Sequence, residues 1–250
     1  CIDDENAVDL INDLNRPVIT YGFNENADVR AVNWQQKGLS SHFTLKRRQR
    51  DDLDIIFNLP GKHNVQNALA AIAVATELDV YDLALQQALA SFQGVGRRFQ
   101  MYGEVEFKSG RALLIDDYGH HPCEISSTID AIRKVWPDKR LVHVFQPHRY
   151  SRTKVLFDEF SLSLSDSDQI ILLDVFAAGE QALEGICSNS LADKIKCIVP
   201  AKDVRVTSIE KIKQVLELVV NDGDILLMQG AGSVGQASYK LANQEIEIIC

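Results

Sequence analysis

Short apolar runs alternate with amphipathic segments through the second part of the chain. This pattern predicts strands near 112–117, 141–146, 169–175 and 224–229, a weaker strand near 196–199, and a hairpin that turns at 108–111. Between the strands, helical spacing predicts helices near 123–135, 153–164, 208–220 and 234–243. Alternation of strands with helices is typical of an α/β fold with a mostly parallel sheet and helices on both faces.

The first part of the chain has a different pattern. We expect Ile2 to end one strand, 18–21 and 54–59 to form others, and helices to cover 64–78 and 82–92. A strand that ends at the second residue would mean that the chain begins inside a fold. The sequence GVGRR at 94–98 has the composition of a hinge. We therefore predict two domains, residues 1–94 and residues 95–250.

Two polar clusters follow directly after apolar runs. DDYGHHP begins at Asp116, and HRYSRT begins at His148. Polar residues at the carboxyl ends of parallel strands lie in the crevice where α/β proteins bind ligands. A carboxylate, two histidines and two arginines in that crevice suit the ribose of a nucleotide and small anions.

The arginines and histidines of these clusters have more than one interpretation. Arg149 and Arg152 are three residues apart, a spacing that suits bidentate capture of a carboxylate but also fits a solvated surface. His120 and His121 precede Pro122 at a predicted helix start, where an anion would bind. They resemble a metal-binding pair only superficially, because a zinc site needs further ligands at set spacing, and we predict no metal site.

Two other polar groups carry open alternatives. Asn64 and Asn67 would share one face of a helix and could bind the edge of an adenine base. Equally, Asn64 could be an N-cap and Asn67 a solvated side chain. Arg97 and Arg98 could reach a triphosphate, or they could solvate a linker.

The segment GAGSVG at 230–235 matches the G-x-G-x-x-G dinucleotide fingerprint. The fingerprint normally opens the first βαβ unit and needs an acidic residue about 20 positions later. Here it follows the last predicted strand. A tight strand-to-helix turn is therefore favoured over NAD binding.

Composition narrows the possible functions. The chain has 250 residues and a net charge of −9, which argues against general nucleic-acid binding. No apolar run approaches the ~20 residues needed to cross a bilayer, and no signal peptide is visible. Five cysteines without a C-x-x-C pair indicate neither a disulfide framework nor a zinc site. These features predict a cytoplasmic protein that does not bind membranes.

Five segments together resemble the Mur ligase family. They are GKHNVQNALAAIAVA from Gly61, GVGRRFQ from Gly94, DDYGHHPCEI from Asp116, FQPHRYSRT from Phe145 and QGAGSVG from Gln229. DDYGHHP together with HRYSRT is similar to the branch of the family that adds L-alanine. The branch that recycles murein tripeptide is the nearest rival.

The resemblance implies an ATP-dependent ligase of peptidoglycan synthesis. In this family the carboxylate of UDP-N-acetylmuramate takes the γ-phosphate of ATP, and the amine of L-alanine then displaces phosphate. The resemblance makes residues 1–94 the tail of a P-loop-type central ATPase domain and residues 95–250 a Rossmann-like C-terminal domain. By the same resemblance Asn64, Asn67, Arg98 and Asp117 bind the nucleotide, and Tyr118, His120, Arg149 and Arg152 surround L-alanine and the new amide.

The chain also departs from the family pattern. No G-x-x-x-x-G-K-[ST] sequence occurs in it, and the UDP-sugar domain and the Mg²⁺ ligands of the family would precede residue 1. We therefore expect a fragment that is inactive alone. A non-catalytic module that binds a nucleotide or an amino acid remains the alternative.

Overall fold

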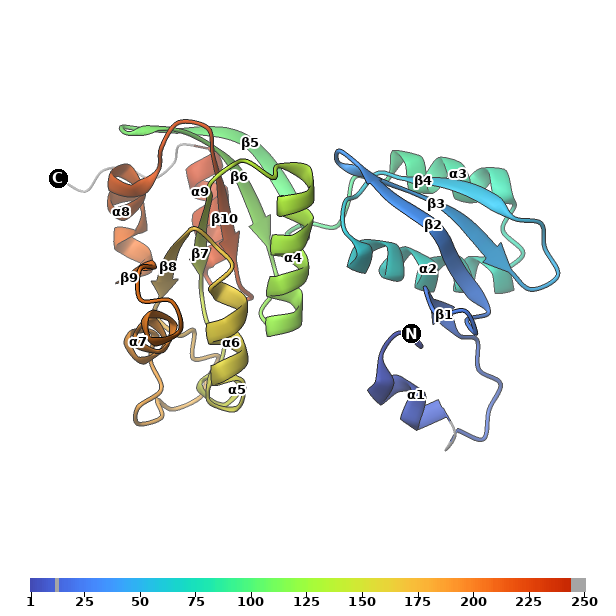
Figure 1. The fold of residues 1–250 in the computed structure, drawn as a ribbon, viewed down its shortest axis with the longest axis horizontal. Coiled ribbons are helices and arrows are strands. Elements are labelled where there is room, and N and C mark those ends of the chain that lie inside the picture. Colours follow the sequence, from blue (N-terminus) through green and yellow to red (C-terminus); the bar gives the residue numbers. More distant parts are fainter. Residues whose placement is uncertain (12–13, 244–250) are drawn as a thin grey trace. The chain divides into compact units, whose positions relative to one another are not determined.

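The computed structural model describes residues 1–11 and 14–243. Two compact units make up the chain, Cys1–Gly94 and Val95–Cys250 (Figure 1). Each has its own sheet and its own apolar core. Among the described residues, no helix combines the length and the apolar character needed to cross a membrane.

The first unit is a four-stranded sheet in the order β1-β2-β3-β4. β1 pairs parallel with β2, and the remaining pairs are antiparallel. Buried and more exposed residues alternate along β3, because successive side chains of a strand point to opposite faces. The elements are α1 (Glu5–Ile11), β1 (Tyr21–Gly22), β2 (Val29–Lys37), β3 (Ser40–Arg47), β4 (Leu53–Phe57), α2 (Lys62–Glu77) and α3 (Asp82–Ser91).

Helix α2 supplies much of the core of the first unit. Val65, Leu69 and Ile72 recur at helical spacing and are at most 1% exposed. They pack with the buried residues of the strands and with Leu85 of α3. The apolar stripe predicted for 64–78 is therefore the stripe that faces the sheet.

The second unit is built around a six-stranded sheet in the order β5-β6-β10-β7-β8-β9. β5 pairs antiparallel with β6, and all other pairs are parallel. This confirms the predicted α/β fold with a mostly parallel sheet. The strands are β5 (Gln100–Phe107), β6 (Gly110–Asp117), β7 (Leu141–Phe145), β8 (Gln169–Leu173), β9 (Asp203–Thr207) and β10 (Asp224–Gln229).

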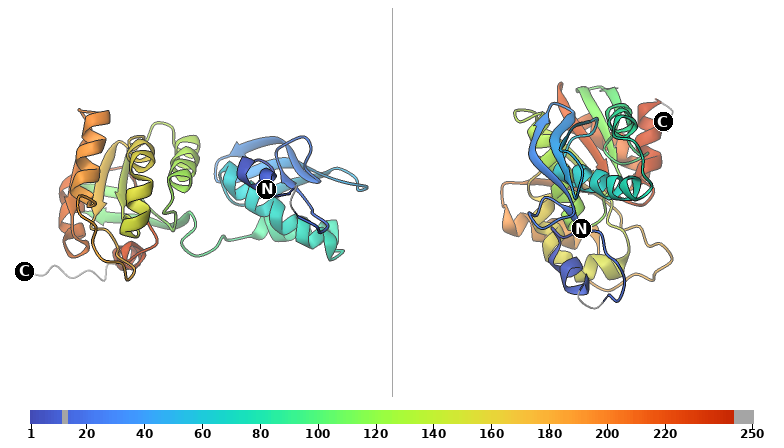
Figure 2. Two further views of the ribbon diagram at one scale, coloured as in Figure 1. Left: turned by 90° about the horizontal axis from the view of Figure 1, so that it is seen from below. Right: turned by 90° about the vertical axis from the view of Figure 1, so that its right-hand side faces the viewer.

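Helices cover both faces of this sheet (Figures 1 and 2). β7, β8 and β10 are buried along their whole length, as parallel strands between two helical layers should be. One core contains apolar residues of α4, α6 and α7, and the other contains those of α8 and α9. The helices are α4 (Pro122–Val135), α5 (Tyr150–Val155), α6 (Phe157–Leu164), α7 (Ser188–Ile198), α8 (Ile212–Val219), preceded by η1 (Ile209–Lys211), and α9 (Val234–Ala242).

The connections after β6 and β10 diverge at one end of the sheet. β6 and β10 are neighbours, but α4 follows β6 onto one face and α9 follows β10 onto the other. Open α/β sheets bind ligands where the connections diverge in this way. We therefore expect a ligand to bind at the residues that follow β6, β7 and β10.

Two predictions in the second unit were wrong. The weak strand near 196–199 belongs mostly to α7, and the edge strand is β9. Leu191 and Ile195 are buried four residues apart, so this segment has helical rather than alternating burial. The single helix predicted at 153–164 is two helices, α5 and α6, that meet at Leu156, where φ is −107° and ψ is 26°.

Three predictions in the first unit also need correction. Ile2 lies in a turn rather than a strand, although its N–H donates to the Tyr21 oxygen at 3.0 Å. The strand predicted at 18–21 is reduced to Tyr21–Gly22, because the Thr20 N–H and hydroxyl both donate to the Asp28 carboxylate at 2.8 Å. Asn64 is not the N-cap of α2: Gly61 is, with φ of 95°.

Candidate functional site

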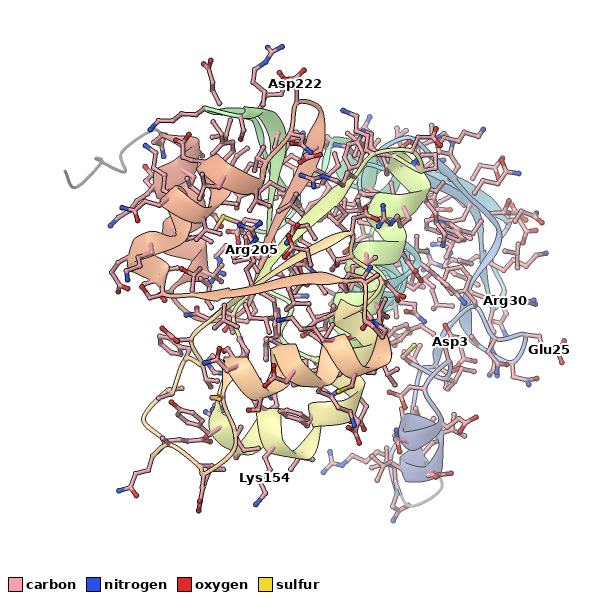
Figure 3. The ribbon with its side chains drawn as sticks, turned by 60° about the vertical axis from the view of Figure 1, so that its left-hand side comes forward. Asp3, Glu25, Arg30, Lys154, Arg205 and Asp222 are labelled. Carbon is pink, nitrogen blue, oxygen red and sulfur yellow. The ribbon has the colours of Figure 1, made fainter. Side chains whose placement is uncertain are left out.

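The ends of β6 and β7 bring the two polar clusters to the same edge of the sheet. β6 ends at Asp117, and β7 ends at Phe145. Both strands pair with β10, which lies between them. Figure 3 marks this end of the second unit by Lys154 of α5 and the opposite end by Asp222, before β10.

A row of aromatic rings crosses this edge. The ring centroids of Tyr118 and His120 are 5.3 Å apart, and those of His120 and His148 are 5.6 Å apart. His148 in turn stacks on Phe176, at 5.5 Å and 14° between ring planes. The row therefore joins segments that follow β6, β7 and β8. Tyr118 is 40% exposed, so one end of the row is open to a ligand.

Arg149 and Arg152 lie at the start of α5, beside this row. Arg149 is exposed and has φ of 69°, with its N–H bonded to the Phe176 oxygen at 2.8 Å. Arg152 is half-buried, and its Nη1 is buried without a hydrogen-bond partner. A guanidinium with an unfilled donor is suited to an anionic ligand, because a buried donor left unpaired is costly.

The neighbouring charges also fix the state of His148. Burial lowers the pKa of His148, and electrostatic interactions with His120, Arg152 and Arg149 lower it further. His148 is therefore a neutral imidazole at neutral pH. Its Nδ1 is buried and has no hydrogen-bond partner. The site thus combines permanent positive charge with a neutral ring that can accept or donate one hydrogen bond.

Asp117 is surrounded by donors from its own unit. Its Oδ1 accepts hydrogen bonds from Gln229 Nε2 at 2.7 Å, the Gly119 N–H at 2.9 Å and Thr128 Oγ1 at 3.2 Å. Its Oδ2 accepts from the Phe99 N–H at 3.0 Å. The carboxylate joins β6, β10 and α4. A ribose hydroxyl would compete with these four donors, because a carboxylate has about four acceptor positions.

The start of α4 is capped from within. Glu124 Oε2 accepts the N–H groups of His120 at 2.8 Å and His121 at 3.0 Å, and His121 Nδ1 accepts the Cys123 N–H at 3.4 Å. Pro122 occupies the first turn, as predicted. Glu124 thus occupies backbone donors that a bound anion would use, and anion binding at the two histidines stays a prediction.

The predicted nucleotide residues are divided between the two units. Asn64 is buried, and its side-chain amide donates to the Pro60 oxygen at 2.7 Å. Asn67 is exposed on the same helix. Arg98 is exposed in the segment that begins the second unit. The structure therefore gives Asn64 a role within the chain and leaves the side chains of Asn67 and Arg98 in solvent.

The glycine-rich turn between β10 and α9 is filled by the chain itself. A Cβ at Gly232 would overlap with Gln146 Oε1 and would lie 2.7 Å from Phe176 Cγ. A Cβ at Gly235 would overlap with the guanidinium of Arg97. Gln146 Oε1 also accepts the Val234 N–H at 3.0 Å, at the N-terminus of α9. The glycines make room for these side chains, which pack directly against the turn.

The site includes two residues that sequence reasoning did not select, His148 and Phe176, and also Arg97, which the sequence predicted only as a triphosphate contact or a linker residue. His148 and Phe176 form half of the aromatic row, and Arg97 packs on Tyr118 with 5.1 Å between Cζ and the ring centroid. His148 could have been selected, because it opens the HRYSRT segment. Phe176 follows β8 without a polar motif. Arg97 also lines a groove of about 830 Å³ along the glycine-rich turn and α9. The other lining residues are Tyr102, Phe176, Ala231, Gly232, Ser233, Gly235, Gln236, Tyr239 and Lys240.

Similar proteins place this fold in a known group. In Legionella pneumophila (strain Lens), a UDP-N-acetylmuramate–L-alanine ligase is 51% identical over 244 residues, which are 96% of this chain and 51% of that protein. The chain thus spans about half the length of the curated relatives it matches. A solved structure of UDP-N-acetylmuramate-alanine ligase MurC from Thermotoga maritima has a TM-score of 0.71 and 25% identity, covering 91% of this chain and 47% of that one.

A further solved structure shows the same fold at lower identity. MurF ligase from Thermotoga maritima, in complex with ADP, has a TM-score of 0.66 and 19% identity, covering 97% of this chain and 52% of that one. The model of the Mur ligase middle domain matches residues 1–75, and that of the Mur ligase, glutamate ligase domain, matches residues 97–232. This chain therefore belongs to the Mur ligase family.

Proposed function

We propose that this chain is part of a UDP-N-acetylmuramate–L-alanine ligase, a cytoplasmic enzyme of peptidoglycan synthesis. The observation that carries the proposal is 51% identity over 96% of the chain to the Legionella ligase. The strand-end cluster of Tyr118, His120, Arg149 and Arg152 supports it, because these residues have the chemistry that an amino-acid substrate requires. Residues 1–94 would be the end of the central ATP-binding domain, and residues 95–250 the C-terminal domain.

The reaction would proceed in two steps. The carboxylate of UDP-N-acetylmuramate attacks the γ-phosphorus of ATP, which forms an acyl phosphate and releases ADP. The amine of L-alanine then attacks the acyl carbon. The new C–N bond forms, the bond from that carbon to the phosphate oxygen breaks, and a proton leaves the amine. Inorganic phosphate is the second product.

The described residues would act mainly in the second step. Arg149 and Arg152 would hold the carboxylate of L-alanine by charge-assisted hydrogen bonds and leave its amine free to attack. His120 and Tyr118 would line the space around the amine and the new amide. Positioning of this kind accelerates a reaction because the reacting atoms no longer have to find each other.

The nucleotide contacts implied by the family resemblance remain part of this proposal. Asn64 and Asn67 would lie near the adenine, Asp117 near the ribose and Arg98 near the phosphates. Asn67 and Arg98 are exposed and could contact ATP as they stand, whereas Asn64 and Asp117 would have to exchange hydrogen bonds. Among residues 1–11 and 14–243, no group of three or more His, Cys, Asp or Glu could hold a metal ion. By the family resemblance, the Mg²⁺ ligands would lie in the remaining portion of the ligase.

Phosphate release tests the proposal. The chain would be assayed alone and joined to the remaining portion of the Legionella ligase, with ATP, Mg²⁺, UDP-N-acetylmuramate and L-alanine. We expect release only in the joined protein, because this chain contains no P-loop sequence. Release by the chain alone would contradict the expectation that it is inactive. A folded but silent joined protein would reject the proposed function.

The same assay separates the two alternatives. Replacing L-alanine with the tripeptide L-alanyl-γ-D-glutamyl-diaminopimelate tests the murein tripeptide ligase. Higher kcat/KM for the tripeptide would favour that alternative. ATP binding by the chain without any ligation in the joined protein would favour a non-catalytic binding module.

A further inference from the structure

Arg97 makes several contacts that the proposed function does not use. Its Nε lies 3.2 Å from Asp116 Oδ2, and its Nη2 donates to the Gly230 oxygen at 2.6 Å. The guanidinium lies over the Tyr118 ring, and the Arg97 oxygen accepts the Tyr118 N–H at 2.6 Å. One residue therefore joins the end of β6, the turn after β10 and the first ring of the aromatic row.

The surroundings of Arg97 are shaped for its side chain. Its backbone has φ of 62°, a conformation that a residue with a Cβ rarely adopts. The third glycine of GAGSVG, Gly235, leaves the space that the guanidinium fills. A strained backbone and a glycine reserved for one side chain indicate that the position of this guanidinium is strongly constrained.

The partner of Arg97 is a buried charge. The side chain of Asp116 is fully buried, whereas that of Arg97 is 27% exposed. Burial raises the pKa of Asp116, and the Arg97 charge opposes this rise. An ion pair of this kind is held in place, because either partner alone would leave an uncompensated charge. Tyr118 is two residues after Asp116 and packs on the same guanidinium.

We propose that Arg97 is a positioning residue for the amino-acid site: it fixes the Tyr118 ring against His120. The inference rests on the proposed function, in which Tyr118 and His120 surround L-alanine. Arg97 touches neither L-alanine nor the acyl carbon, and it acts through Tyr118. Arg97 thereby links the segment after β6 to the turn after β10.

Substitution of Arg97 tests this role. In the joined ligase, Arg97→Met removes the charge and the fork of donors but keeps the length of the side chain. We expect the KM for L-alanine to rise roughly tenfold with less than a threefold change in kcat. Arg97→Lys keeps the positive charge but loses the second hydrogen bond. Its KM for L-alanine should therefore lie between those of the wild type and Arg97→Met. Arg205→Met is the matched control, because Arg205 pairs with Asp203 on the distant edge strand β9 (Figure 3).

A second measurement does not depend on ligation. The measurement is NMR spectroscopy of the chain itself, isotopically labelled at tyrosine and histidine. The ring resonances of Tyr118 and His120 should shift in Arg97→Met and remain in place in Arg205→Met. Gly235→Ala should give the same shifts, because it expels the guanidinium without changing Arg97. A silent joined wild type with these shifts would reject the proposed function and retain the positioning of Tyr118.

Two results would contradict this role of Arg97. Unchanged Tyr118 and His120 signals in folded Arg97→Met would overturn it, as would a KM for L-alanine equal to that of the wild type. Should Arg97→Met not fold, Arg97→Lys replaces it in both measurements. Wild-type signals and a wild-type KM in Arg97→Lys, with Gly235→Ala folded and equally unchanged, would overturn it as well.

Discussion

The turn after β10 and the segments after β6 and β7 lie at the same edge of one sheet, but they differ in what fills them. The turn after β10 has the motif of a ligand site; its glycines pack against Gln146, Phe176 and Arg97, and the same turn lines the groove along α9. The segments after β6 and β7 have no such motif, yet His148 Nδ1 and Arg152 Nη1 are left there without partners. We therefore infer the amino-acid site from the unpaired atoms of His148 and Arg152 rather than from the glycine pattern.

The physical reason lies in what a glycine provides. Glycine only permits a close approach, and the approaching group can be a phosphate or a side chain of the same protein. In this chain the approaching groups are side chains and a backbone oxygen. Unpartnered donors, by contrast, are costly within a fold unless a ligand completes them. Substitutions in each region test this difference between them.

The largest expected effect is on the free energy of unfolding, when a side chain is added to the turn after β10. Gly230 has φ of 144°, and a Cβ there would lie 2.7 Å from the Gln146 oxygen, a backbone atom that cannot move aside easily. Gly230→Ala should lower the free energy of unfolding of the second unit by about 3–5 kcal/mol, from backbone strain and overpacking. Urea denaturation followed by Trp136 fluorescence, in a Trp34→Phe background, would measure it.

Gly179→Ala is the matched control for Gly230→Ala. Gly179 also has positive φ, 86°, but no atom would lie within 4 Å of its Cβ. Backbone strain alone should cost about 1–2 kcal/mol. Equal losses in the two variants would show that the turn after β10 is not closely packed, and the contrast between the two regions would then be lost.

A buried histidine beneath both regions gives a pH-dependent test. His143 of β7 is fully buried, its Nδ1 lies 3.0 Å from Ser167 Oγ, and burial lowers its pKa to about 3. Because the folded pKa is below the unfolded value, its stabilising contribution is complete above about pH 6.5 and is lost as the pH falls toward 3. At pH 4.5 this loss should be about 2–3 kcal/mol.

His143→Gln should remove that part of the acid destabilisation. The test compares the free energy of unfolding at pH 7.5 and pH 4.5 in the wild type and the variant, so that the carboxylates common to both cancel. The difference between the two pH values should be smaller in the variant. If the difference is the same, His143 does not remain neutral in the folded chain, and its burial does not set its charge.

The open region is tested by its arginines. In the joined ligase, Arg149→Ala and Arg152→Ala should each raise the KM for L-alanine roughly 10- to 150-fold, because each loses a charge-assisted hydrogen bond worth about 1.5–3 kcal/mol. Lys154→Met is the control: Lys154 is an exposed cation of the same helix (Figure 3). Unchanged L-alanine kinetics in both arginine variants would remove these residues from the amino-acid site.

The sequence predicted the layout of the second unit better than its details. Apolar runs such as Ile225–Met228 give strands that are buried on both faces, and these strands carry the predicted polar clusters to one edge. Burial in α7 was misjudged because Ile195 and Ile198 lie in a short apolar stretch that fits either period. The break between α5 and α6 at Leu156 was not predicted, because no glycine or proline lies at that position.

Within the site, sequence spacing identified residue types but not their partners. Asp117 was selected as a carboxylate at a strand end, yet its four internal donors come from positions as distant as Gln229, 112 residues later. Arg97 and Arg98 were equivalent by composition, and only the fold turns Arg97 inward. Such pairings depend on tertiary contacts, which no local pattern encodes.

The last prediction is that NAD has no effect on the melting temperature, and it concerns the G-x-G-x-x-G segment at 230–235. If Arg97 and Gln146 fill the turn after β10, NAD at millimolar concentration should leave the melting temperature of the chain unchanged. A ligand present at ten times its dissociation constant would stabilise the second unit by about 1.4 kcal/mol, which is a shift of roughly 3–6 °C for a domain of this size. ADP serves as the parallel titration, because it shares the adenosine and diphosphate of NAD. A shift with NAD alone would mean that the glycine pattern, and not the unpartnered donors, marks a ligand site in this sheet.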